Sequence, residues 1–226
     1  MPLLGPAAML LSFDVAAEAM AEHDDWHTHE HLPERLSIPG FLRGSRWVAI
    51  NRPSRYVVLY EVRDLATLTS PAYLDRLNNP SPWTAKMMPH YRGMTRGLCR
   101  VDASFGAALG SVAYVARFKP RDEAAASLRS WLREGVLPAL PNQRGLGAAH
   151  LLIGASAAPM TREQGIRGAD ASVDCAVMVV GYDADAVSQL SEGTLAMHEL
   201  ERRGATEAVV GVYRIHDALT HAEVLA

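Results

Sequence analysis

Apolar runs and segments with helical spacing alternate along the first half of the chain. Runs rich in aromatic and β-branched residues predict strands, whereas apolar residues that recur every three or four positions predict helices. Asp14 follows the first apolar run and can cap a helix, and Pro33 is expected to weaken that helix at Leu32. The predicted elements are a strand at 8–13, a helix from about 14, strands at 41–50 and 55–62, a helix at 64–77 and a strand at 95–101.

The second half repeats this β-α-β-β-α-β order. An offset of 105 residues places Trp26 on Trp131 and Leu32-Pro33 on Leu137-Pro138. The predicted elements are a strand at 111–118, a helix at 120–134, strands at 146–154 and 173–182, a helix at 184–203 and a strand at 208–215. The segment 155–172 has no periodicity and is expected to be a mobile loop.

These elements predict an α+β protein made of two tandem ferredoxin-like units, residues 1–105 and 106–226. Each unit would form a four-stranded antiparallel sheet with helices on one face, and the two free sheet faces would pack together. The first unit carries the chemistry-bearing residues, so we expect it to hold the candidate active pocket. The second unit is expected to be mainly structural.

A stripe of histidines marks the first predicted helix. His23, His27 and His31 recur at i, i+4 and i+8, so they share one face of a helix, whereas His29 lies on the opposite side. Glu30 and Glu34 lie beside this histidine face of the predicted helix. Such a stripe is compatible with a solvated face, a metal or haem site, or an acid–base site.

The internal repeat distinguishes among these interpretations. The offset of 105 places the three histidines on the apolar face of the second predicted helix, at Leu128, Leu132 and Val136. The histidine face should therefore point at its own sheet, where an imidazole without a partner costs free energy. We expect a polar pocket between helix and sheet in the first half and a sealed core in the second. The alternative is a helix rolled outward, with its histidines in solvent.

The histidine segment resembles a known sequence signature. Residues 26–34 read WHTHEHLPE and are followed by IPGF at 38–41 and by Arg46-Trp47. This resembles the W-(Y/H)-x-x-E-H-L-P-E signature of the EthD-like group of dimeric α/β-barrel proteins, and the resemblance covers about residues 9–103. It implies that the two sheets form a barrel, with a pocket between sheet and helices. Relatives in this superfamily include isomerases, lyases, polyketide cyclases, cofactor-free monooxygenases and some haem enzymes.

The resemblance singles out His31 as the motif histidine and Glu30 as its neighbour. An imidazole takes up or releases a proton near neutral pH, so we expect His31 to act as the general base or acid, with His27 one turn earlier as the second proton-transfer group. Arg46 can hold a carboxylate or enolate oxygen through its planar fork, although it is also typical of a strand surface. Aromatic side chains can form flat walls for a ring or can be ordinary core. The candidate substrate-binding residues are Trp26, Glu30, Arg46, Tyr60, Trp83 and His23.

A metal or haem site is the alternative use of the same residues. His27 and His31 have the i, i+4 spacing of helical zinc ligands, and Glu30 or Glu34 could add an oxygen. The order HExxH is absent, and no cysteine is near. We therefore expect no cofactor, with haem or a divalent metal at the histidine pair as the alternative. The sequence also contains no GxGxxG, Walker or GxSxG motif.

The composition of the chain limits the classes of binding partner that we expect. A net charge of -3 and scattered basic residues give no electrostatic footprint for nucleic acid. Cys99 and Cys175 are in apolar runs without a CxxC companion, which is typical of buried free thiols. No apolar run approaches the length of a membrane span, and the N-terminal segment lacks the basic residues of a signal peptide. We expect a cytoplasmic protein, with a further homodimer compatible but not required.

Together these features predict a cofactor-independent enzyme of the isomerase, lyase or cyclase type. It would transfer a proton on an aromatic, polyketide or lactone-like substrate. The alternatives are a haem- or metal-dependent oxygenase of the same fold and a protein that binds a metabolite without converting it.

Overall fold

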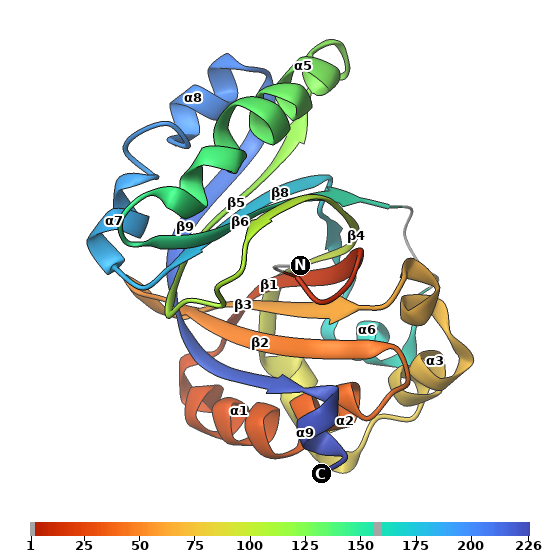
Figure 1. Ribbon diagram of the computed structural model, residues 1–226. Coiled ribbons are helices and arrows are strands. Elements are labelled where there is room, and N and C mark those ends of the chain that lie inside the picture. Colours follow the sequence, from red (N-terminus) through yellow and green to blue (C-terminus); the bar gives the residue numbers. More distant parts are fainter. Residues whose placement is uncertain (1–2, 156–159) are drawn as a thin grey trace.

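Eight strands close one antiparallel barrel in the computed structural model, which describes residues 3–155 and 160–226 (Figure 1). The first half contributes the spatial order β4-β1-β3-β2 and the second β9-β5-β8-β6, joined through β2–β9 and β4–β6. The protein is therefore an α+β barrel. The strands are β1 (Ala7–Val15), β2 (Phe41–Ala49), β3 (Arg52–Val62), β4 (Tyr91–Gly106), β5 (Val112–Pro120), β6 (Leu146–Gly154), β8 (Cys175–Gly181) and β9 (Ala205–Thr220), with the short β7 (Ala171–Ser172) beside β4.

Helices cover the outside of the barrel in two groups, one over each half (Figure 1). The first group contains η1 (Ala17–Ala19), α1 (Met20–Trp26), η2 (His27–His31), α2 (Leu32–Leu36), η3 (Leu65–Thr69), α3 (Pro71–Asn78), α4 (Pro82–Met87) and η4 (Met88–His90). The second contains η5 (Asp122–Ala124), α5 (Ala125–Ser130), η6 (Trp131–Val136), η7 (Leu137–Asn142), α7 (Ala184–Gln189) and α8 (Met197–Arg202). Two helices of the second half lie over the first half instead: α6 (Arg162–Arg167) beside α3, and the C-terminal α9 (His221–Val224) beside α2.

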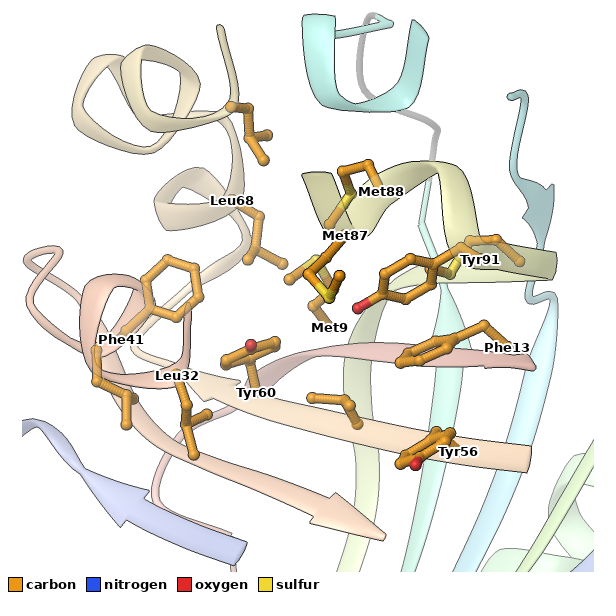
Figure 2. Close-up of a cluster of buried hydrophobic side chains, with 14 of the residues drawn as sticks. Met9, Phe13, Leu32, Phe41, Tyr56, Tyr60, Leu68, Met87, Met88 and Tyr91 are labelled. Atoms are coloured by element: carbon orange, nitrogen blue, oxygen red, sulfur yellow. The ribbon is translucent and has the colours of Figure 1, made fainter. Parts of the chain in front are cut away.

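The core has three layers because alternate strand residues point inward and outward. Ala8, Leu10 and Val115 belong to the cluster inside the barrel. Outward residues of the first half pack under its helices, where aromatic rings from four strands lie together (Figure 2). The labelled members are Met9, Phe13, Leu32, Phe41, Tyr56, Tyr60, Leu68, Met87, Met88 and Tyr91. Cys99 and Cys175 are buried free thiols, as predicted.

The first helix differs from the prediction at both ends. It begins at Ala17, because Asp14 belongs to β1 and its carboxylate accepts hydrogen bonds from Arg52 and Arg55. It also continues through Leu32-Pro33, because η2 is a π-helix in which the Leu32 N–H bonds to the His27 carbonyl. The wider π turn lets the helix pass a proline that has no N–H to donate.

Other corrections concern helices that are shorter than predicted. The helix expected at 64–77 is interrupted at Ser70, which caps α3 through its side chain. The helix expected at 184–203 is two short helices, α7 and α8. The expected loop at 155–172 contains α6 and β7, while its residues 156–159 lie outside the described part of the chain. Among the described residues, no helix is long and apolar enough to cross a membrane.

Candidate active site between helix and barrel

The histidine stripe lies against the barrel wall. His23, His27 and His31 are 1%, 2% and 7% exposed, so the interpretation as a solvated face is wrong. The fourth histidine of the segment, His29, is exposed, and its ring Nδ1 is hydrogen-bonded to the Asp25 carbonyl. The predicted polar region between helix and sheet is therefore present in the first half.

The equivalent second-half face is apolar and buried, as the repeat predicts. Leu128, Leu132 and Val136 are buried. A cavity of about 330 Å³ nevertheless opens beside Leu128 and Leu132, between α5 and the strands. The apolar core of this half is therefore buried, as predicted, with this cavity at its edge.

The three histidines differ in their hydrogen bonds. His23 is satisfied by the Tyr91 hydroxyl at 3.1 Å from Nε2 and by Asp24 at 3.3 Å from Nδ1. Nδ1 of His27 and Nδ1 of His31 are buried and have no hydrogen-bond partner among the described residues. Buried ring nitrogens without partners are costly, so a stretch that carries two of them is a candidate binding region.

Burial keeps these imidazoles neutral. It is the largest cause that holds the pKa of His31 well below 6.5, and the Arg35 guanidinium is the next. Burial and then Arg46 lower the pKa of His27 in the same way. Both rings are therefore unprotonated at neutral pH and can accept a proton or a hydrogen bond.

A small cavity adjoins His31. Its volume of about 30 Å³ is enough for about one or two water molecules. Tyr60 contributes a buried hydroxyl with no partner among the described residues. The cavity is lined by Met9, Leu11, His31, Arg35, Tyr60, Tyr73, Leu77, Arg96, Thr161, Glu163, Gln164 and Arg167.

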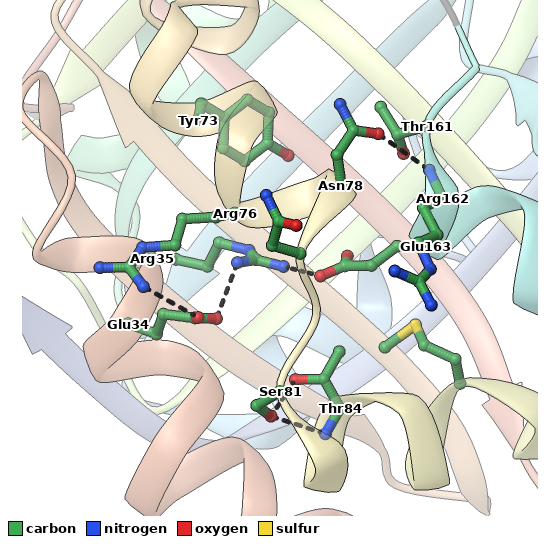
Figure 3. Close-up of polar contacts among 12 residues, drawn as sticks. Glu34, Arg35, Tyr73, Arg76, Asn78, Ser81, Thr84, Thr161, Arg162 and Glu163 are labelled. Atoms are coloured by element: carbon green, nitrogen blue, oxygen red, sulfur yellow. Dashed lines mark hydrogen bonds and ion pairs between the residues drawn. The ribbon is translucent and has the colours of Figure 1, made fainter.

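Arg35 is one of three arginines that line this cavity, with Arg96 and Arg167, and it was not predicted. It is 2% exposed and is bound by the carboxylate of Glu163, a residue of α6 (Figure 3). Its other nitrogen donates to Glu34 at 2.8 Å. Burial alone would lower the pKa of Arg35, but Glu163 and the other nearby acidic groups raise it, so the guanidinium stays charged. The i+4 spacing of the histidine stripe continues to Arg35 and is the sequence signal for it.

The helix α6 closes the cavity from the second half of the chain. Thr161 and Gln164 form a capping box at its start, and the Arg162 N–H donates to the Asn78 side chain of α3 (Figure 3). Arg167 at its end is paired with Asp170 at 2.7 Å. The assignment of the second half as mainly structural therefore omits residues that line the cavity.

Of the predicted substrate-binding residues, only Tyr60 lines the cavity. Trp26 is fully buried and packs against His31 in a tilted arrangement, with ring centroids 4.3 Å apart. Glu30 is bound by the Trp26 indole and by Ser81. Trp83 donates to Glu22, outside the cavity.

Arg46 and His23 lie under the helix and away from the cavity lining. Arg46 is 4% exposed and donates to the Asp24 carbonyl and the Thr28 hydroxyl, so its interpretation as a surface strand residue is wrong. Its position beneath α1 explains its effect on the pKa of His27. We therefore infer that Arg46 holds the histidine helix against the barrel and does not contact a ligand in this cavity.

The arrangement does not fit a metal ion or haem. The carboxylates of Glu30 and Glu34 are held by other partners, so neither joins the histidine pair. No group of three or more histidine, cysteine or acidic side chains is placed to hold a metal ion within residues 3–155 and 160–226. The cavity of about 30 Å³ is also far smaller than a haem.

Comparison with known proteins identifies the fold. No protein-family model and no curated protein matches the sequence. An anthrone oxidase-like protein superposes with a TM-score of 0.74 at 10% identity, over 100% of this chain and 98% of that chain. A presumed monooxygenase from Lactobacillus acidophilus NCFM superposes with a TM-score of 0.59 at 9% identity, over 96% and 97% of the two chains. These likenesses establish a shared fold. That fold is an eight-stranded antiparallel barrel covered by helices and closed within one chain.

Proposed function

We propose that the chain is a small-molecule enzyme in which His31 moves a proton at a carbon next to a carbonyl group. The observation that supports this is the pairing, at one cavity, of a buried neutral imidazole with the buried guanidinium of Arg35. The substrate class we propose is an aromatic, polyketide or lactone-like compound, and the reaction type is that of an isomerase, lyase or cyclase. The proton transfer itself uses only protein groups.

The proposed roles follow from charge. His31 accepts the proton, and negative charge then develops on the carbonyl oxygen of the substrate. Among the donors that line this cavity, we propose that Arg35 and the Tyr60 hydroxyl stabilise that oxygen; Arg96, whose buried Nη2 has no partner among the described residues, is a further donor. His27 lies one turn away, with its ring centroid 5.5 Å from that of His31, and serves as the second proton-transfer group.

Glu163 has a place in this scheme. Its carboxylate binds Arg35, where we expect the substrate oxygen to bind. Because the cavity holds only about one or two waters, a substrate requires α6 to move and Glu163 to leave Arg35. Glu163 is thus proposed to occupy the oxyanion position in the absence of substrate.

A second candidate is an oxidase that begins with the same step. The names of the structural neighbours, anthrone oxidase-like protein and presumed monooxygenase, favour it. The enolate formed at His31 would react with dioxygen, so that a CH2 group and O2 become a C=O group and water. A non-catalytic metabolite-binding protein is the remaining alternative, because the described residues do not fit the metal ion or haem of a cofactor-dependent oxygenase.

The test is deuterium exchange at the carbon next to the carbonyl, followed by NMR in D2O with anthrone and a panel of aromatic ketones and lactones. We expect exchange with the wild type and a loss of about 100-fold or more in His31→Ala. His29→Ala is the matched control, because His29 is on the same helix but exposed. Equal exchange in His31→Ala and wild type would refute the role of His31. Oxygen uptake with anthrone would favour the oxidase, and binding without exchange would favour the binding protein.

We also propose that the two halves are tandem ferredoxin-like repeats related to the EthD-like group. The strand order within each half supports this, since β4-β1-β3-β2 and β9-β5-β8-β6 are equivalent. The π-helical segments η2 and η6, each followed by Leu-Pro, support it further.

A further inference from the structure

We propose that the end of the barrel beside β7 binds a small organic carboxylate through Arg117. This end is separate from the histidine cavity, because Arg117 points into the barrel whereas the histidines pack on its outer face. A cavity of about 480 Å³ opens here, a size typical of small-molecule sites. Its lining includes Arg55, Arg117, Phe118, Lys119, Val173 and Val209.

Arg117 is a buried cation without a carboxylate. It follows Ala113 and Val115 on the inward face of β5 and is 9% exposed. Its one hydrogen bond within the described part of the chain is to the Thr95 hydroxyl, at 2.5 Å. No acidic side chain of the described residues lies within 4.0 Å of it. A buried unpaired guanidinium is costly, and an anionic ligand would remove that cost.

The other buried arginines show that this is unusual in the molecule. Three arginines are buried among the described residues, Arg35, Arg46 and Arg117. Arg35 is bound by Glu163, and Arg46 has an Asp24 oxygen at 3.8 Å. Arg117 alone of these three lacks such a partner.

The neighbouring charges do not neutralise Arg117. Arg55 also points inward, but the nearby acid Asp14 is shared between Arg55, at 2.9 Å, and Arg52, at 3.1 Å. Burial and then the Arg55 guanidinium lower the pKa of Arg117. The acidic residues of the lining, Asp174 and Glu207, are exposed, as is Lys119. The buried part of this cavity therefore has positive charge in excess.

A second polar group without a partner in the described part of the chain lies near Thr95, although it is not part of the cavity lining. Ser12 faces Thr95 across the β1–β4 pairing, and its hydroxyl is fully buried with no hydrogen-bond partner among the described residues. A carboxylate can accept two parallel hydrogen bonds from a guanidinium and a further one from a hydroxyl. The apolar wall formed by Phe118, Val173 and Val209 adds room for a compact hydrocarbon body. An organic carboxylate fits these features better than a bare inorganic anion.

The test is calorimetric titration of the full chain with benzoate in chloride-free HEPES, with sulfate as the inorganic probe. We expect benzoate to bind and its affinity to fall by about ten-fold or more in Arg117→Met, because a hydrogen-bonded charge pair is lost. Lys119→Met is the matched control at the exposed rim and should retain the affinity. Failure of benzoate to bind, equal affinity in Arg117→Met, or binding of sulfate without benzoate would each overturn the proposal.

A measurement on the wild type covers the case in which Arg117→Met does not fold. Phenylglyoxal modifies arginine side chains, and peptide mass spectrometry locates the modified positions. We expect benzoate to slow modification of Arg117 and to leave the exposed Arg63 unaffected. Equal modification of Arg117 with and without benzoate would contradict the assignment.

Discussion

Replacing the two unpartnered histidines by their second-half equivalents should make the protein less sensitive to acid. The variant is His27→Leu with His31→Val, which copies Leu132 and Val136. In the wild type, burial holds both imidazoles neutral, with pKa values well below 6.5. Below pH 6.5 the unfolded chain therefore takes up protons that the folded chain does not. The free energy of unfolding consequently falls as the pH falls.

The magnitude follows from the difference in proton uptake. A histidine that titrates at 6.5 when unfolded and stays neutral when folded costs about 2 kcal/mol of stability between pH 7 and pH 5. The pair therefore costs about 4 kcal/mol over that range, and the double variant should not show this loss. His150 contributes a similar loss to both proteins, because burial lowers its pKa to about 4. The difference between the proteins thus isolates the pair.

The assay is urea unfolding at pH 7 and pH 5, with free energies obtained by linear extrapolation. His198→Leu is the control, since His198 is exposed and should change neither value. At pH 7 the double variant should be at least as stable as the wild type, because two buried ring nitrogens without partners are removed. An equal loss of stability on acidification in variant and wild type would refute the burial of neutral imidazoles.

Two further predictions concern the closure of the site and the turn before β2. Glu163→Gln leaves Arg35 buried without its strongest partner. We therefore expect the free energy of unfolding, measured in urea, to fall by about 3 kcal/mol, and hydrogen exchange in α6 to become faster. Unchanged exchange would contradict the role of this ion pair. Gly40→Ala should cost about 1–3 kcal/mol, because Gly40 has φ +99° and an added Cβ would lie 2.5 Å from the Thr67 hydroxyl. Gly93→Ala is its control, since Gly93 has φ +57° but open space around it, and an equal loss in both variants would show that the contact with Thr67 does not matter.

The parts of the fold that have periodicity can be predicted from the sequence. Strand positions follow from short runs of β-branched and aromatic residues, and the burial of the histidine stripe follows from comparison with Leu128, Leu132 and Val136. The boundaries of helices are less predictable because they depend on tertiary contacts. Asp14 is a residue type that often caps helices. Two arginines of the neighbouring strand β3 bind its carboxylate, however, and hold it within β1.

The site itself is only half predictable. His31 and Tyr60 are predicted and line the cavity, whereas Arg35 has the right spacing but is a residue type usually assigned to the surface. Glu163 lies 128 positions from Arg35, in a segment without periodicity, so no local pattern indicates it. Arg117 illustrates the same limit, because its lack of a carboxylate depends on strands that are distant in sequence.

The contribution of α6 has a consequence for how such a site can arise. A barrel assembled from two identical subunits carries each residue twice, so every change on one side appears on the other. Here one chain supplies all eight strands, and a segment of the second half closes the cavity of the first. The two sides are therefore free to diverge. The first half can carry destabilising polar groups while the second half keeps leucine and valine at the matching positions. An exact twofold axis would not allow the two halves to differ in this way.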